Sequence, residues 1–261
     1  MQQSLDIAWL DLGLFSTLLL IPLGISQCYR LNISRDALIS IARMAIQLFL
    51  VGLYLEFLFT LDSIVINISW LIVMALVGGS AITTKAQLLR KQALACVVVG
   101  LCCGLFPVLC ITVVLLIQPT PLYSSQYLIP MGGMLLGNSM SAIIIALKTL
   151  TKAFSEREME YQGAIALGVS GRYACQPFVQ DALKSAFAPT LATISTTGLV
   201  SLPGMMTGQI LGGVSPLIAI KYQLVIMMAI FIMMTIATTV SIEMLLKLNL
   251  SQSGANRLEH K

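Results

Sequence analysis

Residues 198–213 read Gly198-Leu-Val-Ser-Leu-Pro-Gly-Met-Met-Thr-Gly-Gln-Ile-Leu-Gly-Gly213, an uncharged stretch that is crowded with glycine and has a central proline. Gly204, Gly208 and Gly212 recur at every fourth position, so in a helix they form one bare face that a second helix can approach closely. Pro203 removes a backbone donor from the middle of such a helix, and the freed carbonyl needs a partner. The stretch therefore predicts a helix that is buried in protein or lines a pathway. Its predicted packing or pathway residues are Pro203, Gly204, Thr207, Gly208, Gln209 and Gly212.

The composition is typical of an integral membrane protein. Of the 261 residues, 57% are hydrophobic and only 10% are charged, and the mean hydropathy is +0.92. The charges are bunched, and the windows between them are long enough for spans of about 20 residues. We expect an all-α polytopic fold, with a single transmembrane permease domain over 1–250 and a polar, disordered tail over 251–261. The predicted helices, about seven, lie near 8–28, 40–60, 63–83, 92–117, 127–147, 191–213 and 219–245.

The distribution of Lys and Arg predicts the orientation of these helices. The basic residues gather in the loops after the first, third, fifth and seventh predicted helices, and only Lys221 lies on the other side. Because basic loops stay in the cytoplasm, we expect the N-terminus outside and the C-terminus inside the plasma (bacterial inner) membrane. The net charge of +4 is then a topology signal and not evidence for nucleic-acid binding.

The segment 148–190 is the only sizeable soluble element that we expect, and its position makes it cytoplasmic. Ser155-Glu-Arg-Glu158 matches a capping box, which predicts that a helix begins there. A turn at Val169-Ser-Gly171 should lead into a second helix from about Arg172 to Ala188. Nowhere does the chain contain a Gly-x-x-x-x-Gly-Lys-Ser/Thr loop, so any ATP hydrolysis would belong to a partner.

Other polar and small residues within the predicted spans leave two interpretations open. Gly133, Gly137 and Ser141 repeat the four-residue spacing, which fits ordinary packing or a moving interface along a pathway. Asn138 would either form interhelical hydrogen bonds or contact substrate. Glu56 and Lys221 both map near the outer surface, where they are interfacial charges or pair as an outer gate.

Metal-ligating residues are not evident from the sequence. Cys96, Cys103 and Cys110 form a stripe, but a rise of about 10 Å per seven helical residues is too long for one ion to bridge neighbours. Buried cysteine also behaves as a small hydrophobic residue, so we favour packing, and we favour packing for the 14 Met residues as well. Histidine occurs only once, as His260 in the tail, which excludes His-based metal sites within the spans.

Two motifs resemble one known family. They are Ile129-Pro-Met-Gly-Gly-Met-Leu-Leu-Gly-Asn-Ser-Met140 and the stretch from Gly198 to Pro216, followed by Tyr222-Gln223. They look like the FetB-type permeases, a family of bacterial iron-export ABC membrane subunits that also has plant members linked to aluminium tolerance. The resemblance implies a homodimeric permease subunit that exports a metal ion or metal complex and is not itself an enzyme. It also implies that ATP and Mg²⁺ bind a separate cytoplasmic ATPase, and that this chain binds no cofactor.

The region from Gln162 through Gly168 to Pro189 resembles the cytoplasmic coupling segment of ABC-transporter permeases, which inserts into a groove of the ATPase. The acidic residue that often leads that motif is replaced here by Gln162 and Gly163, with Glu160 slightly upstream. The coupling residues that this resemblance implies are Glu160, Gln162, Gly163, Ala164, Gly168, Ser170 and Arg172.

A gradient-driven secondary transporter of a small substrate is the alternative function. Such transporters commonly have internal repeats and carboxylates in mid-span. This sequence has no clear repeat, and Asp11, Glu56, Asp62 and Glu243 all lie near predicted helix ends. Iron as the substrate follows from the resemblance alone.

Overall fold

The described part of the protein is built of helices. The computed structural model describes residues 8–31, 33–61, 63–88 and 91–251, and within these ranges it contains no strand beyond an isolated bridge between Thr197 and Ser201. The predicted all-α polytopic fold is thus confirmed, whereas the predicted tail lies almost wholly outside the described residues. The elements are α1 (Trp9–Ser16), η1 (Thr17–Leu19), α2 (Leu20–Cys28), α3 (Ser34–Leu61), α4 (Ile64–Lys85), α5 (Lys91–Ile111), η2 (Thr112–Ile117), α6 (Ser125–Glu156), α7 (Glu158–Ala166), α8 (Gly171–Thr196), α9 (Gly204–Leu211) and α10 (Pro216–Ser251).

Six helical segments of the described residues are long and apolar enough to cross a membrane. They are Trp9–Cys28, Ser34–Leu61, Ile64–Lys85, Lys91–Ile117, Ser125–Glu156 and Pro216–Leu248. Each corresponds to one of the predicted spans. Several helices run past the predicted ends, because hydropathy measures the apolar part of a helix and not its full length.

The predicted continuous helix over 191–213 is wrong. Instead, α8 ends at Thr196, the chain turns at Gly198 with a φ of +90°, and α9 begins at Gly204. Pro203 does not lie in mid-helix but is the N-cap of α9, in extended conformation. Proline disfavours the helical conformation of the residue before it, so the chain enters Pro203 extended and starts a new helix directly after it. We call residues 197–203 the helix break.

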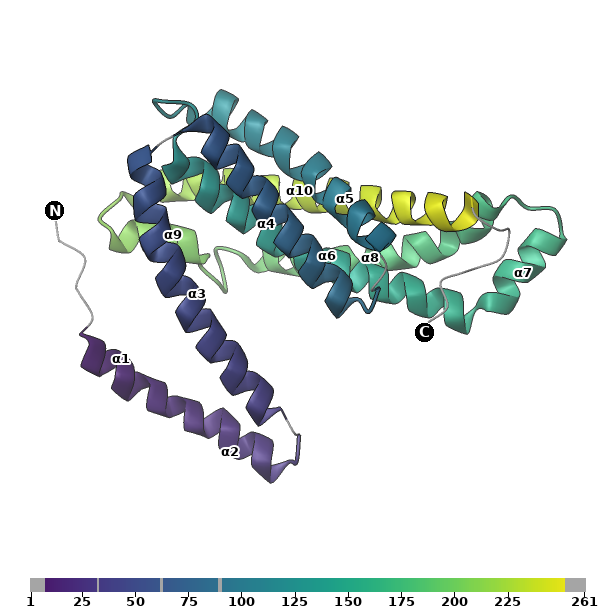
Figure 1. Ribbon diagram of the computed structural model, residues 1–261, viewed down its shortest axis with the longest axis horizontal. Coiled ribbons are helices and arrows are strands. Elements are labelled where there is room, and N and C mark those ends of the chain that lie inside the picture. Colours follow the sequence, from purple (N-terminus) through teal and green to yellow (C-terminus); the bar gives the residue numbers. More distant parts are fainter. Residues whose placement is uncertain (1–7, 32, 62, 89–90, 252–261) are drawn as a thin grey trace.

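The core of the bundle consists of α4, α5, α6, α8 and α10 (Figure 1), with the most extensive contact between α5 and α10. Glycines on α5 allow this contact. A Cβ atom added to Gly104 would lie 2.9 Å from the carbonyl oxygen of Met233, and one added to Gly100 would lie 2.7 Å from that of Ala237. The two backbones therefore approach as closely as a missing side chain permits.

The first three helices lie apart from this core. Figure 1 shows α3 leading away from the bundle towards α1 and α2. Among the residues of α3 only Leu58 is buried, and α3 meets the bundle near its C-terminal end, where Tyr54 contacts Trp70 with ring centroids 4.3 Å apart. The exposed apolar side chains of α1, α2 and α3 are those expected of helices that face lipid.

The end of α6, α7 and the beginning of α8 form a projection that we call the coupling knob, residues 154–181. A helix does begin within the predicted motif, because α7 starts at Glu158, but the predicted cap at Ser155 is wrong: α6 continues to Glu156, and the N-cap of α7 is Arg157, which makes no side-chain cap. The predicted turn is confirmed: Gly168 has a φ of +85°, and α8 begins at Gly171. Since only glycine adopts that φ without strain, the turn requires Gly168.

Candidate transport pocket and coupling surface

The helix break is irregular backbone within an uncharged stretch of the chain. In the hydrocarbon core, backbone that leaves a helix is tolerated only where protein buries it or where it lines a cavity that contains water. Here the amide of Gly198 donates to the carbonyl of Ser201 at 2.9 Å, which closes a tight loop, and the loop opens onto a cavity. Broken helices of this kind commonly form substrate sites in transporters.

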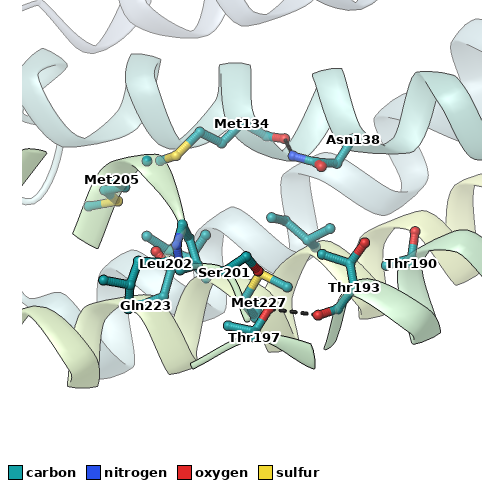
Figure 2. Close-up of a pocket in the computed structure, with 14 residues that line it drawn as sticks. Met134, Asn138, Thr190, Thr193, Thr197, Ser201, Leu202, Met205, Gln223 and Met227 are labelled. Carbon is teal, nitrogen blue, oxygen red and sulfur yellow. Dashed lines mark hydrogen bonds between the residues drawn. The ribbon is translucent and has the colours of Figure 1, made fainter. Parts of the chain in front are cut away.

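The cavity, which we call the pocket, has a volume of about 310 Å³ and is lined by α6, α8, the helix break, α9 and α10 (Figure 2). It is open on one side, where Asn138, Thr193 and Ser201 are exposed. At 1.5 Å per residue, the pocket-lining residues of α6 and α10 lie roughly 10–20 Å along these helices from the first residue of each. This distance is about half of the 30 Å that a membrane-spanning helix must cross. Its lining residues are Met134, Asn138, Thr190, Thr193, Thr197, Ser201, Leu202, Pro203, Gly204, Met205, Gln223, Ile226, Met227 and Ile230.

Polar groups line part of the pocket, and some of their hydrogens are already in use. The hydroxyl of Thr197 donates to the carbonyl of Thr193 at 2.7 Å, and the amide nitrogen of Asn138 donates to the carbonyl of Met134 at 2.8 Å (Figure 2). Gln223 is 6% exposed, and its Oε1 has no hydrogen-bond partner within the described residues. The pocket therefore offers hydroxyl and amide oxygens as acceptors and amide N–H groups as donors.

The predicted pathway residues divide between the pocket and other surfaces. Asn138, Pro203 and Gly204 line the pocket. Thr207 does not line it, and its hydroxyl donates to the carbonyl of Pro203 at 3.2 Å. At Gly137, Gly204 and Gly208 an added Cβ atom would have no neighbour within 4 Å. At Gly133 it would lie 3.4 Å from the Met74 side chain. At Gly212 it would lie 3.3 Å from the carbonyl oxygen of Gly208, which precedes it in the same segment. Close helix contacts at Gly137 and Gly208, and the role of the exposed Ser141, stay predictions for an assembly with a second copy.

Sequence reasoning missed much of the pocket and the closest helix contact. Gln223, Thr190, Thr193, Thr197 and Ser201 line the pocket although none of them was predicted as a pathway residue; an uncharged run of Ser and Thr before the glycine-rich stretch was the available signal. Gly100 and Gly104 have the same four-residue spacing as the glycines that were noticed, and they make the actual close contact.

The other candidate sites are not assembled within one copy of the chain. Glu56 and Lys221 are both exposed, and the ion pairs of the described residues do not include one between them, so the outer gate stays a prediction. Cys96 is buried, whereas Cys103 and Cys110 are exposed. The described residues contain no group of three or more His, Cys, Asp or Glu that could hold a metal ion.

Aromatic and charged contacts hold the coupling knob together. The ring of Phe154 lies 5.0 Å from that of Phe178 and 5.8 Å from that of Tyr161, and the Arg157 guanidinium lies 4.8 Å above the Phe178 ring. Arg157 also pairs with Glu160 at 2.7 Å, and this hydrogen bond lowers the pKa of the Glu160 carboxyl. These contacts clamp α7 onto α6 and α8.

The tip of the knob exposes apolar side chains outside the apolar spans. Met159 is 90% exposed, Leu167 87% and Tyr173 70%. Large apolar side chains exposed on a polar projection are candidates for contacts with a protein partner. The predicted coupling residues Gln162, Gly163, Gly168 and Ser170 are exposed beside it and Ala164 is half-buried, whereas Glu160 and Arg172 already pair with Arg157 and Glu243.

Comparison with known proteins places the chain in a family. Residues 9–249 match the family described as "Uncharacterised protein family (UPF0014)". The chain belongs to the UPF0014 family. A UPF0014 membrane protein of Synechocystis is 31% identical over 90% of each chain. The Arabidopsis thaliana "Protein ALUMINUM SENSITIVE 3" is 34% identical, over 88% of this chain and 80% of its own.

A third relative bears on transport. The Escherichia coli "Probable iron export permease protein FetB" is 27% identical, over 83% of this chain and 82% of its own. The resemblance to FetB-type permeases is thereby confirmed, and the chain belongs to a family of membrane proteins. No solved structure matches the chain.

Proposed function

We propose that this UPF0014 protein is the membrane-spanning subunit of an ABC transporter that exports iron or another metal from the cytoplasm. In this proposal a separate ATPase subunit, which binds ATP and Mg²⁺, docks on the coupling knob, and two copies of the chain form the pathway. The N-terminus lies outside the plasma membrane and the knob and C-terminus lie inside. The observation that carries the proposal is the apolar tip of the knob at Met159, Leu167 and Tyr173, on a chain that lacks a phosphate-binding loop.

The geometry of the knob supports docking of a partner. Clamping by Arg157 and the aromatic cluster keeps α7 and α8 in one arrangement, which lowers the entropy cost of binding. Exposed large apolar side chains on a preformed projection supply the central contacts of a typical interface. Iron as the cargo is supported by the name of the E. coli relative.

The test is affinity purification of the chain from its native membrane in mild detergent, with identification of co-purifying subunits and an ATPase assay with and without iron. We expect a cytoplasmic ATPase to be recovered, and its activity to rise with iron. Recovery of the chain alone, without ATPase activity, would contradict the proposal and favour a gradient-driven transporter.

Two variants test whether the ATPase binds at the tip of the coupling knob. Leu167→Asp puts a charge into the apolar tip and should abolish recovery of the ATPase, because a buried unpaired carboxylate is costly at an interface. Lys152→Asp introduces the same residue at an exposed position of α6 outside the tip and should leave recovery unchanged. Equal loss in both variants would place the interface elsewhere.

A further inference from the structure

The charge of the pocket constrains what it can hold. None of its lining residues has an ionisable side chain. A divalent cation in this pocket would find no opposite charge, and an ion whose charge is not compensated costs several kcal/mol or more to bury. A negatively charged complex meets the same barrier, because no Lys or Arg lines the pocket either. The lining is therefore matched to a ligand without net charge.

The hydrogen-bonding groups indicate which face such a ligand must present. The hydroxyls of Thr193 and Thr197 and one N–H of Asn138 donate within the protein, which leaves their oxygens as acceptors. The Gln223 amide can both donate and accept. A ligand whose outer surface carries hydrogen-bond donors and acceptors would pair with these groups.

The size and the apolar part of the pocket complete the description. A volume of 310 Å³ holds on the order of ten or more water molecules, so a bare ion would leave it almost empty. It is also at the lower end of the volumes of small-molecule sites, about 300–1,000 Å³. Leu202, Ile226 and Ile230 offer carbon surface on which the carbon framework of a chelator can pack.

We infer that the pocket between α6, α8, α9 and α10 binds an electroneutral metal complex, with the metal enclosed by its own chelating ligands and not by protein side chains. The inference rests on the proposed function for its choice of a metal as cargo. Polar side chains of the pocket then form hydrogen bonds with the outer polar groups of the complex, and the Gln223 amide is the principal specificity group.

The experiment measures binding by isothermal titration calorimetry to the full-length purified chain in detergent, without an ATPase. Three iron probes differ in charge: the tris(acetohydroxamate) complex of Fe³⁺, which is neutral and carries N–H donors, the trianionic tris(catecholate) complex of Fe³⁺, and aqueous Fe²⁺ under anaerobic conditions. We expect the neutral complex to bind at least about tenfold more tightly than either charged probe.

Matched variants test the site itself. Gln223→Met keeps the length of the side chain, removes the amide and should weaken binding of the neutral complex about tenfold. Thr238→Val is the control, because Thr238 is a buried residue of the same helix whose hydroxyl oxygen also lacks a partner but does not line the pocket. Asn138→Asp should reverse the preference by placing a carboxylate in the pocket, so that Fe²⁺ binds more tightly than the neutral complex.

Several results would overturn the inference: tighter binding of Fe²⁺ or of the anionic complex to the wild-type chain, no binding of the neutral complex, or equal effects of Gln223→Met and Thr238→Val. The proposed function fails separately, if no ATPase co-purifies. Export driven by ATP together with a preference for Fe²⁺ would leave the proposed function standing and refute this inference alone.

Discussion

Substitution of Gly104 by alanine tests the closest helix contact of the bundle. The added Cβ atom would lie 2.9 Å from the Met233 carbonyl oxygen and 3.3 Å from the Ala237 Cβ atom, so α5 and α10 must move apart. Overpacking of this kind costs about 1–3 kcal/mol. Alanine also gains about 1 kcal/mol of helix propensity over glycine. Gly52→Ala gains only the second term, because nothing lies within 4 Å of a Cβ atom at that position in α3.

The difference between the two variants isolates the steric effect. We expect Gly104→Ala to be about 1–3 kcal/mol less stable than Gly52→Ala. Equilibrium unfolding of the detergent-solubilised chain by added SDS, followed by circular dichroism, measures this difference. Gly100→Ala should act in the same direction, because its Cβ atom would lie 2.7 Å from a backbone oxygen. If Gly104→Ala were as stable as Gly52→Ala, the close approach of α5 and α10 would be refuted.

Three further predictions concern the coupling knob and α9. Gly168→Val should uncouple ATP hydrolysis from transport without lowering expression, because it strains the turn at a φ of +85° beside the proposed docking surface; unchanged coupling would place the contact elsewhere. Gly208→Leu should weaken dimer packing or arrest transport, as measured by crosslinking and by flux in vesicles, and wild-type values would remove Gly208 from the interface. Arg157 lowers the pKa of the Glu160 carboxyl, so the stability from this pair is complete above the ordinary pKa of a glutamate and is lost as the pH falls through the lowered value. At neutral pH the amides of α7 should therefore exchange more slowly in the wild type than in Glu160→Gln, and in strong acid the two rates should be equal. A difference that persists in strong acid would contradict the role of the pair.

Composition was enough to predict the spans but not the continuity of one of them. Apolar windows locate membrane helices because about 20 residues must be apolar whatever they pack against. The stretch 191–213 satisfies that criterion and is nevertheless broken, because Gly198 and Pro203 set local backbone angles that hydropathy does not measure. Likewise Ser155 has the pattern of a cap, but packing of Phe154 into the knob lets α6 continue through it.

The pocket was predictable only in part for a different reason. Asn138, Pro203 and Gly204 stood out as unusual residues within apolar sequence, and they do line it. Gln223 was not identified because its importance depends on neighbours from α6 and α8 that are far away in the sequence. Spacing within one helix describes a face, whereas a cavity is defined by which faces meet.

The helices α6 and α8 both run from the coupling knob to the pocket, so a movement of the knob would be transmitted along them to the pocket wall. From Gly171 to Thr190, α8 covers roughly 28 Å, and from Asn138 to Phe154, α6 covers roughly 24 Å. A rotation of about 5° at the knob would therefore displace the pocket end of α8 by roughly 2.5 Å, a shear of the size that packed helices make. Pro177 and Pro189 each remove one hydrogen bond from α8, so this helix bends most easily near these two positions, the second of which adjoins the pocket wall at Thr190. A force applied to the coupling knob would thus change the shape of the pocket while α6 and α8 stay folded.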